Sequence, residues 1–276
     1  MSGAAYFCAF TLLSLSLPIA AHSQSSAPAN SSQDSPSVAL TKIMNTQAAF
    51  DHGLNNPSGP RLRFVKFGDL HRQDGHFTQY RVYAVGVPEG EPYVVALWNI
   101  GMAQEHDIPI VANAAYVNGK GLLMIRKPNP DEENSDTVSA GAEFDVAVQV
   151  ADGEPVRFLL KSRDNKIMVP GTLVPFPIES TDKGCKLTAL LAEPEGQGIL
   201  IYADGFPPNS TVTVEGGSDG QLRQTAHRVD AAGHMEFAVL PYLKDTDSGI
   251  LKETITTKPC TVSIQIPWGK DSYHKH

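Results

Sequence analysis

The sequence predicts an all-β protein that consists of two antiparallel β-sandwich domains in tandem. From Arg61 onward, apolar and polar residues alternate in short runs, and this period of two is typical of strands that face a core on one side. Turn residues such as Asp152-Gly153 separate the runs. A third observation is the proline-rich stretch at residues 174–178, which lies between two blocks of such runs and is expected to be extended.

The first 23 residues predict a cleaved signal peptide. They contain no Lys, Arg, Asp or Glu and carry an apolar run from residue 4 to residue 17. Ala21 and Ser23 are small residues at the positions that a cleavage after Ser23 requires. The alternative is an uncleaved membrane anchor, but about 14 apolar residues are fewer than the roughly 20 that span a bilayer. We therefore expect a secreted or periplasmic protein with no stable membrane insertion after cleavage.

The remaining chain is expected to contain two folded domains between flexible ends. Residues 24–37 lack bulky apolar side chains and predict a disordered linker. Residues 38–179 are assigned to an N-terminal β-sandwich domain, in which residues 38–50 fit a short helix or an entry strand equally well. Residues 180–270 are assigned to a C-terminal β-sandwich domain, and residues 271–276 to a flexible tail.

In the first domain the predicted strands follow one another at short intervals. The apolar or alternating runs are residues 61–64, 80–85, 93–100, 108–117, 121–126, 143–150, 155–161 and 167–178. Residues 127–136 contain two prolines and four acids and predict an exposed loop.

The second domain is organised around residues 197–217, which predict a strand, a wide turn and a second strand. About six strands are expected between Cys185 and Gly269. Residues 205–214 contain a Gly-Phe-Pro-Pro turn before a Val-rich run, and residues 229–237 contain Asp230 and Gly233 before a run centred on Phe237.

These two stretches resemble bacterial Ig-like and fibronectin-III-like modules, over about residues 181–269. The resemblance implies an Ig-like sandwich and carries almost no information on activity. No Trp lies between the two cysteines, so the chain departs from true immunoglobulin domains. The first domain is similar to the N-terminal part of secreted bacterial proteins.

Cys185 and Cys260 are predicted to form a disulfide. Cleavage of the signal peptide removes Cys8 and leaves this even pair in a chain bound for an oxidising compartment. Each cysteine begins an alternating run, so parallel pairing of the first and last strands of the domain would bring them together. The alternative is two buried, reduced thiols.

Net charge argues against nucleic acid as a partner. The chain has a formal net charge of −8 and no cluster of Lys and Arg. We expect instead a protein or glycan ligand of the cell envelope.

The histidines of the first domain are weak candidates for metal ligands. If Asp74-Gly75 is a two-residue turn, His71 pairs with Thr78 and Gln73 with His76, and both imidazoles share one face as diagonal neighbours. Two ligands are too few for a zinc site. Four acids between residues 131 and 136 lack the spacing of a calcium loop, so a solvated loop is favoured. We expect no bound metal and no cofactor.

No residue is predicted to be catalytic. Glu105, His106 and Asp107 are adjacent and would point in different directions on an extended chain. Ser218 has the wrong glycine spacing for a nucleophile elbow, and its surroundings predict a hairpin turn. The aromatic residues of the first domain are expected to be core residues more often than sugar-stacking ones. They are Tyr80, Tyr83, Tyr93, Trp98 and Tyr116.

The predicted function is a secreted or periplasmic, non-enzymatic binding or structural protein of the cell envelope or exterior. One alternative is an enzyme with a site around His71, His76, His106 and Asp107, which would require polar groups that converge in one pocket. Another is a carbohydrate-binding module, which would require two or three aromatic rings on one surface.

Overall fold

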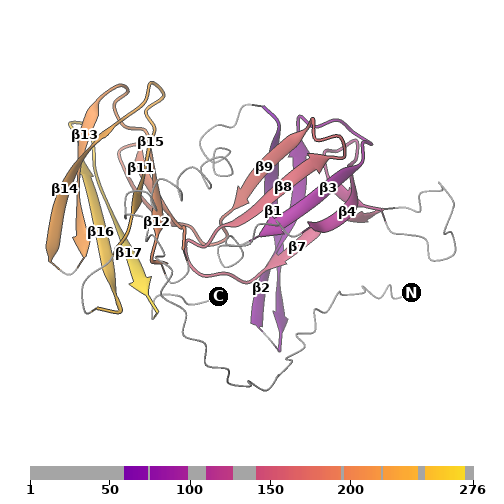
Figure 1. Ribbon diagram of the computed structural model, residues 1–276, viewed down its shortest axis with the longest axis horizontal. Helices are drawn as coiled ribbons and strands as arrows, with labels where there is room; N and C mark the ends of the chain where they lie inside the picture. The colour runs from indigo at the N-terminus through magenta and orange to yellow at the C-terminus, as the bar shows by residue number, and fades with distance from the viewer. Residues whose placement is uncertain are drawn as a thin grey trace, which may run out of the picture. The chain divides into compact units, whose positions relative to one another are not determined.

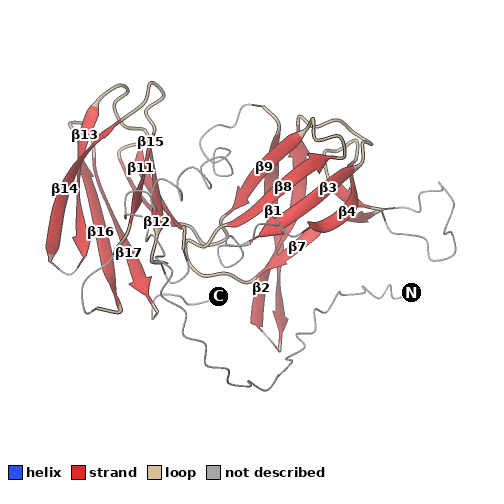
Figure 2. Ribbon diagram, viewed as in Figure 1, coloured by secondary structure: helices blue, strands red, loops and turns tan. Residues whose placement is uncertain are grey.

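The computed structural model describes residues 59–73, 75–98, 110–126, 141–193, 196–218, 220–241 and 246–270 of the 276-residue chain. These residues form seventeen β-strands, and no α-helix occurs among them (Figure 2). The pairs between these strands are antiparallel. The all-β, antiparallel fold class predicted from the alternation is confirmed.

The strands β1 to β9, here called the N-terminal block, form two sheets with a shared core (Figure 1). Their bounds are β1 (Arg61–Arg72), β2 (Gly75–Val85), β3 (Tyr93–Trp98), β4 (Ile110–Val117), β5 (Leu123–Ile125), β6 (Ala142–Glu143), β7 (Asp145–Val148), β8 (Val156–Ser162) and β9 (Met168–Leu173). The strand orders are β1-β2-β7 and β6-β5-β4-β3-β8-β9. Val82, Tyr93 and Phe158 have no exposed surface and come from both sheets. The expected core role is confirmed for Tyr80 and Tyr93.

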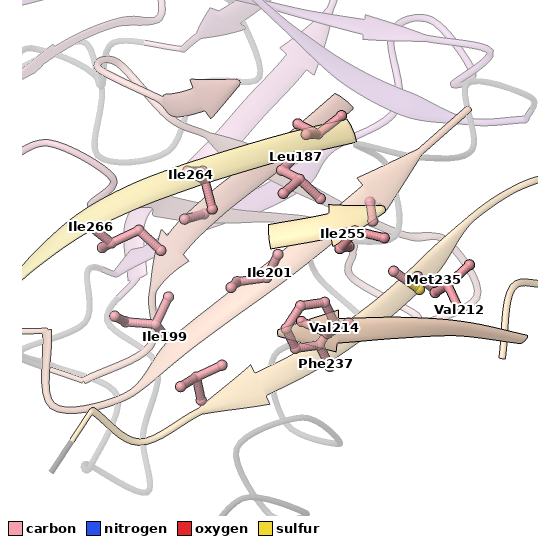
Figure 3. Close-up of a cluster of buried hydrophobic side chains, with 14 of the residues drawn as sticks. Leu187, Ile199, Ile201, Val212, Val214, Met235, Phe237, Ile255, Ile264 and Ile266 are labelled. Atoms are coloured by element: carbon pink, nitrogen blue, oxygen red, sulfur yellow. The ribbon is translucent and has the colours of Figure 1, made fainter. Parts of the chain in front are cut away.

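The strands β10 to β17, here called the C-terminal block, form two four-stranded sheets. Their bounds are β10 (Ile178–Asp182), β11 (Cys185–Leu191), β12 (Ile199–Asp204), β13 (Thr211–Ser218), β14 (Gln221–Arg228), β15 (Met235–Val239), β16 (Ser248–Thr256) and β17 (Thr261–Gly269). The strand orders are β10-β11-β12-β15 and β14-β13-β16-β17. Figure 3 shows Leu187, Ile199 and Ile201 of the first sheet in one cluster with Val214, Ile255 and Ile264 of the second. This shared cluster is the core of a sandwich.

The wide turn predicted within residues 197–217 carries the chain from one sheet to the other. It joins β12 to β13, which belong to different sheets. Gly205 begins it with φ +77°, and a Cβ there would lie 2.1 Å from the carbonyl oxygen of Gly184, so only glycine fits. Phe206, which is 2% exposed, anchors the turn in the core.

Cys185 and Cys260 are joined by a disulfide with their Cα atoms 6.4 Å apart. The predicted pairing of these cysteines agrees with the structure, but the predicted reason is wrong. Cys185 begins β11 in one sheet, and Cys260 directly precedes β17 in the other, so the two strands do not pair. The bond crosses the sandwich instead. Alternation shows that a side chain faces a core, but it does not show which sheet the strand joins.

Residues 174–178, which lead from β9 into β10, make contacts with both blocks. Phe176 packs against the N-terminal core, and Ile178 packs against the C-terminal core. Gly153, in the turn before β8, donates a hydrogen bond of 2.7 Å from its N–H to the carbonyl oxygen of Phe176. Its own carbonyl oxygen accepts one of 2.8 Å from the N–H of Leu191. The division into two domains near residue 180 stays a prediction.

Two details of the predicted strands are wrong. The run at residues 143–150 is interrupted at Phe144, so that β6 joins the six-stranded sheet and β7 the three-stranded one. The run at residues 167–178 contains β9 and the start of β10 with a break at residues 174–177. Seven strands, β11 to β17, lie between Cys185 and Gly269, where about six were expected.

Several predictions lie outside the described residues. They concern the signal peptide (1–23), the linker (24–37), the tail (271–276) and the acidic loop (127–136). Within the part of the chain that the structure describes, no helix is long and apolar enough to cross a bilayer.

Candidate functional site

The β1–β2 hairpin has one face in the N-terminal core and one face that points away from it. On β2, Tyr80, Val82 and Ala84 are buried, whereas the residues between them are partly exposed. β7 pairs with β2 only between Thr78 and Arg81, so the far end of the hairpin extends beyond that strand. The side chains on the non-core side, which we call the outward face, are partly exposed on β2 and partly or fully exposed on β1.

Three aromatic rings of the hairpin each have an arginine guanidinium over them. The distances from the guanidinium carbon to the ring centroid are 4.7 Å for Arg63 and Tyr83, 4.9 Å for Arg81 and Phe67, and 5.6 Å for Arg72 and Phe77. All three lie within the range of a cation–π contact. Because a guanidinium uses its flat side in such a contact, the N–H groups around its edge can still donate to an acceptor.

A β-bulge brings the three pairs onto the same face. Lys66 pairs with Tyr80 and Gly68 with Gln79, which leaves Phe67 as the extra residue in β1. The insertion reverses the alternation of β1, so Arg63 before it and Arg72 after it both lie on the outward face. Phe67 itself is 41% exposed beside Arg81.

Two carboxylates lie beside Arg81, the middle arginine of the three. Arg81 Nε lies 2.8 Å from Glu143 Oε2 and 3.8 Å from Asp145 Oδ1. Burial raises the pKa of Asp145, the positive charge of Arg81 acts against this rise, and the negative charge of Glu143 adds to it. Arg63 makes no ion pair with any described residue.

The two histidines lie at the tip of the same hairpin, on its other side. His71 pairs directly with His76 and Arg72 with Gly75, so the predicted register, with His71 opposite Thr78, is wrong. Gly75 is part of β2 with φ +149°, and a Cβ there would meet the Gln149 side chain at 2.3 Å. The glycine is thus needed in the strand and does not mark the turn.

The geometry of the histidine pair does not form a metal site. The rings are stacked with centroids 4.3 Å apart and planes 10° apart. Imidazole lone pairs lie in the ring plane, so two parallel rings do not aim them at a common point. Among the described residues, no group of three or more His, Cys, Asp or Glu side chains is arranged to hold a metal ion. The predictions of no metal and no cofactor stay predictions.

Polar groups converge in a pocket of the C-terminal block that the sequence did not suggest. The pocket has a volume of about 200 Å³, and its polar lining consists of Glu179, Lys186, Thr188, Tyr202 and Asp204. Lys186 Nζ lies 2.7 Å from Glu179 Oε1, and the Asp204 carboxylate is hydrogen-bonded to His234 Nδ1. None of these residues belongs to the predicted enzyme site. Of that site, His71 and His76 lie on the hairpin, and His106 and Asp107 lie outside the described residues.

The Asp204–His234 pair lacks the third group of a nucleophilic site. A carboxylate bonded to Nδ1 orients an imidazole for acid–base work, but the ring must also reach a nucleophile. No described hydroxyl or thiol is hydrogen-bonded to His234. The backbone N–H of His234 donates to Asp230 Oδ1 at 2.8 Å, so the pair fastens the turn at residues 230–234 to the end of β12.

One further charged pair lies partly inside the C-terminal core. Arg223, Gly216 and Glu253 are aligned across β14, β13 and β16. Glu253 is 1% exposed, and its Oε1 lies 3.2 Å from Arg223 Nη2. Burial raises the pKa of Glu253, and Arg223 acts in the opposite direction. Glu253 is thus buried, whereas Arg223 is about half exposed at the edge of the sheet.

The outward face was not identified from the sequence, because the register between β1 and β2 decides which residues lie on it. Of its three aromatic residues, only Tyr83 was considered in the sequence. Arginines at positions 61, 63, 72 and 81 among alternating apolar residues were the available signal. Comparison with known proteins gives no further guide, since no family model matches the chain and no curated protein matches it either.

Proposed function

We propose that this chain is an exported, non-enzymatic binding protein that recognises carbohydrate through the outward face of the β1–β2 hairpin. The observation that carries the proposal is the row of three aromatic rings, Tyr83, Phe67 and Phe77, each with a guanidinium over it. Sugars offer apolar C–H groups to aromatic rings and hydroxyl oxygens to N–H donors, and this face provides both kinds of partner.

The length of the row fits an oligosaccharide. Tyr83 and Phe77 are both on β2, six residues apart, and a strand rises by about 3.3 Å per residue. The rings at the two ends are therefore roughly 20 Å apart. A single sugar would contact one of the three pairs, whereas a short linear glycan could contact all of them.

Export is part of the proposal and has two supports. Residues 1–23 have the composition of a signal peptide. The Cys185–Cys260 disulfide is of the kind that persists in oxidising compartments. The Ig-like assignment of the C-terminal block is also proposed, with support from its two four-stranded antiparallel sheets.

The test is binding of purified protein to a panel of immobilised glycans, with the double variant Phe67→Ala/Tyr83→Ala. We expect at least one class of glycan to retain the protein, and the double variant to lose that retention. Leu222→Ala is the matched control, because it removes a 72%-exposed apolar side chain from the C-terminal block. Retention of wild type and double variant alike would show that this face is not the binding site, and no retention on any glycan would refute the proposal.

A further inference from the structure

The strand β14 has one free edge. It stands first in the order β14-β13-β16-β17 and pairs with β13 alone among the described strands (Figure 1). Seven of its eight residues are exposed, and the eighth, His227, is partly buried. The strand pairs with β13 without a bulge, and none of its residues is a proline. Bulges and prolines are devices that keep other strands away from a sheet edge, so β14 is open to a further strand.

The backbone groups on this edge can be identified from the register. The N–H of Val229 donates a hydrogen bond of 2.9 Å to the carbonyl oxygen of Ser210, which is its partner when the β13–β14 register is continued by one pair. Hydrogen-bonded pairs alternate with non-hydrogen-bonded pairs in an antiparallel ladder. The N–H and C=O groups of residues 222, 224, 226 and 228 are therefore directed away from β13, at intervals of about 7 Å. An extended peptide presents donors and acceptors at the same spacing.

The sandwich is open on the side of this edge. The rings of His227 on β14 and Phe237 on β15 have centroids 4.7 Å apart, so β15, the edge strand of the other sheet, lies opposite β14. Thr225 pairs directly with Val214, yet Thr225 is exposed and Val214 is buried. Solvent reaches the inward positions of β14 because no described strand covers them.

A pocket of about 190 Å³ lies at the same edge. Leu222 of β14, Val239 of β15 and Leu251 of β16 contribute apolar walls, and Arg223 also lines it. A strand added beside β14 would place every second side chain between the two sheets. The side chain opposite Arg223 would lie beside the pocket, which has room for one apolar group.

The charges of β14 favour an acidic partner over a second copy of the chain. The strand contains Arg223 and Arg228 and no acidic residue. Arg223 lies 3.2 Å from the buried Glu253, whereas Arg228 makes no ion pair with any described residue. Two copies of β14 paired with each other would bring four arginines together with no carboxylate on either strand, and like charges on paired strands are destabilising. A peptide with a carboxylate opposite Arg228 would gain an ion pair instead.

We propose that β14 is a docking edge for an extended peptide segment of a partner protein, which joins the sheet as a fifth strand. The peptide exchanges backbone hydrogen bonds with residues 222, 224, 226 and 228. It places a carboxylate beside Arg228 on the outer face of the sheet and an apolar side chain in the pocket beside Arg223. This site lies in the C-terminal block and does not depend on the glycan-binding face of the hairpin.

The first measurement is amide hydrogen exchange by NMR on the full chain with its disulfide intact. In the free protein the amides of residues 222, 224, 226 and 228 should exchange rapidly, and those of residues 223, 225 and 227 slowly. Protection of the first set at every protein concentration would show that the chain itself covers the edge. Protection that grows with concentration would show that a second copy covers it. Either result would overturn the proposal.

The probe for the partner is a phage-displayed library of random dodecapeptides, selected on the same protein. The selected peptides should protect the amides of residues 222, 224, 226 and 228. Ala226→Pro removes one N–H from the free edge and keeps the pairing with β13, and Ala226→Val is the matched control that retains this N–H. We expect the peptides to bind wild type and Ala226→Val equally, and Ala226→Pro about tenfold more weakly.

A second pair of variants tests the charge. Arg228→Gln should weaken the binding of peptides that contain an acidic residue by about two- to fivefold. Lys252→Gln removes an exposed cation from β16, two strands away, and should not change it. Equal affinities for wild type and Arg228→Gln would overturn the acidic class of the partner.

Two further outcomes would overturn the docking edge itself. One is a library that yields no peptide able to protect the four amides. The other is equal binding of the selected peptides to wild type and to folded Ala226→Pro. If Ala226→Pro does not fold, the protection of the four amides in wild type decides the question alone.

Discussion

Gly216 is the residue that lets a buried charge reach its partner. The Glu253 side chain passes over it toward Arg223, and a Cβ at position 216 would lie 1.8 Å from Glu253 Oε2. The backbone of Gly216 is not in the left-handed region, so the requirement for glycine comes from space alone.

Gly216→Ala is expected to destabilise the protein by about 1–3 kcal/mol, because the carboxylate must move within a packed core. Thermal and denaturant unfolding would measure this loss. Gly119→Ala is the matched control, since its Cβ would meet nothing closer than 3.6 Å. Its cost should stay within about 0.5 kcal/mol. In a Glu253→Ala background the cost of Gly216→Ala should shrink, and additive costs would contradict the proposed clash.

Glu253 should also make stability depend on pH. Its pKa is raised by burial, so the folded protein holds this proton at a pH where the unfolded chain has released it. The contribution of Glu253 to stability is therefore greatest below the ordinary pKa of glutamate and falls as pH rises through the raised value.

Glu253→Gln removes the titrating group. The melting temperature of this variant should therefore rise relative to that of wild type as pH increases from 4 to 8. The exposed Glu215 of β13 provides the control substitution Glu215→Gln. Parallel melting curves for wild type and Glu253→Gln at every pH would show that the buried carboxyl does not titrate as described.

At the scale of strands, the alternation of apolar and polar residues was enough to locate most strands and to predict which residues on each strand face the core. Val82 and Ala84 of β2 and Val212 and Val214 of β13 are buried as the period of two requires. This pattern does not show which strands pair with one another. Phe144 shows why, because the chain leaves one sheet there and joins the other within a single alternating run.

The outward face of the hairpin could be recognised only from the way β1 pairs with β2. Alternation alone places Arg63 and Phe67 on one side of β1, but the bulge between Lys66 and Gly68 decides that Arg72 lies there too. One inserted residue changes which side chains share a face, and nothing in a single sequence marks that insertion except a glycine. The position of the turn, and not the bulge, places His71 opposite His76 rather than Thr78, because Arg72 pairs with Gly75.

The disulfide acts between two sheets, and its loss should affect the sandwich as a unit. It links positions 75 residues apart. The double variant Cys185→Ser/Cys260→Ser is expected to lose about 2–5 kcal/mol of stability, mainly because the unfolded chain gains conformational freedom.

Thermal unfolding of wild type with and without a thiol reductant would measure this effect. The reductant should lower the melting temperature of the C-terminal block and leave that of the N-terminal block nearly unchanged. The double variant provides the control, since the reductant should have no further effect on it. A melting temperature of the wild type that does not respond to reduction would contradict the stabilising role of the bond.

At the scale of the whole chain, export and cleavage determine which form of the protein is available to bind a glycan. Cleavage after Ser23 predicts an exported product that begins at Gln24. Intact mass of protein recovered from the periplasm or the medium would show this start. Exported protein that retains Met1 and sediments with membranes would instead identify the apolar run as an anchor.

Gly153 has a consequence for any attempt to divide the molecule. Its two backbone hydrogen bonds lead to Phe176 and to Leu191, and the segment between them contributes Phe176 to one core and Ile178 to the other. A truncation near residue 175 would therefore expose apolar surface on both fragments and remove backbone partners from each. The proline-rich stretch at residues 174–178 suggests itself as the place to separate the two blocks. A cut there should nevertheless give fragments that are especially prone to aggregate when each is expressed alone.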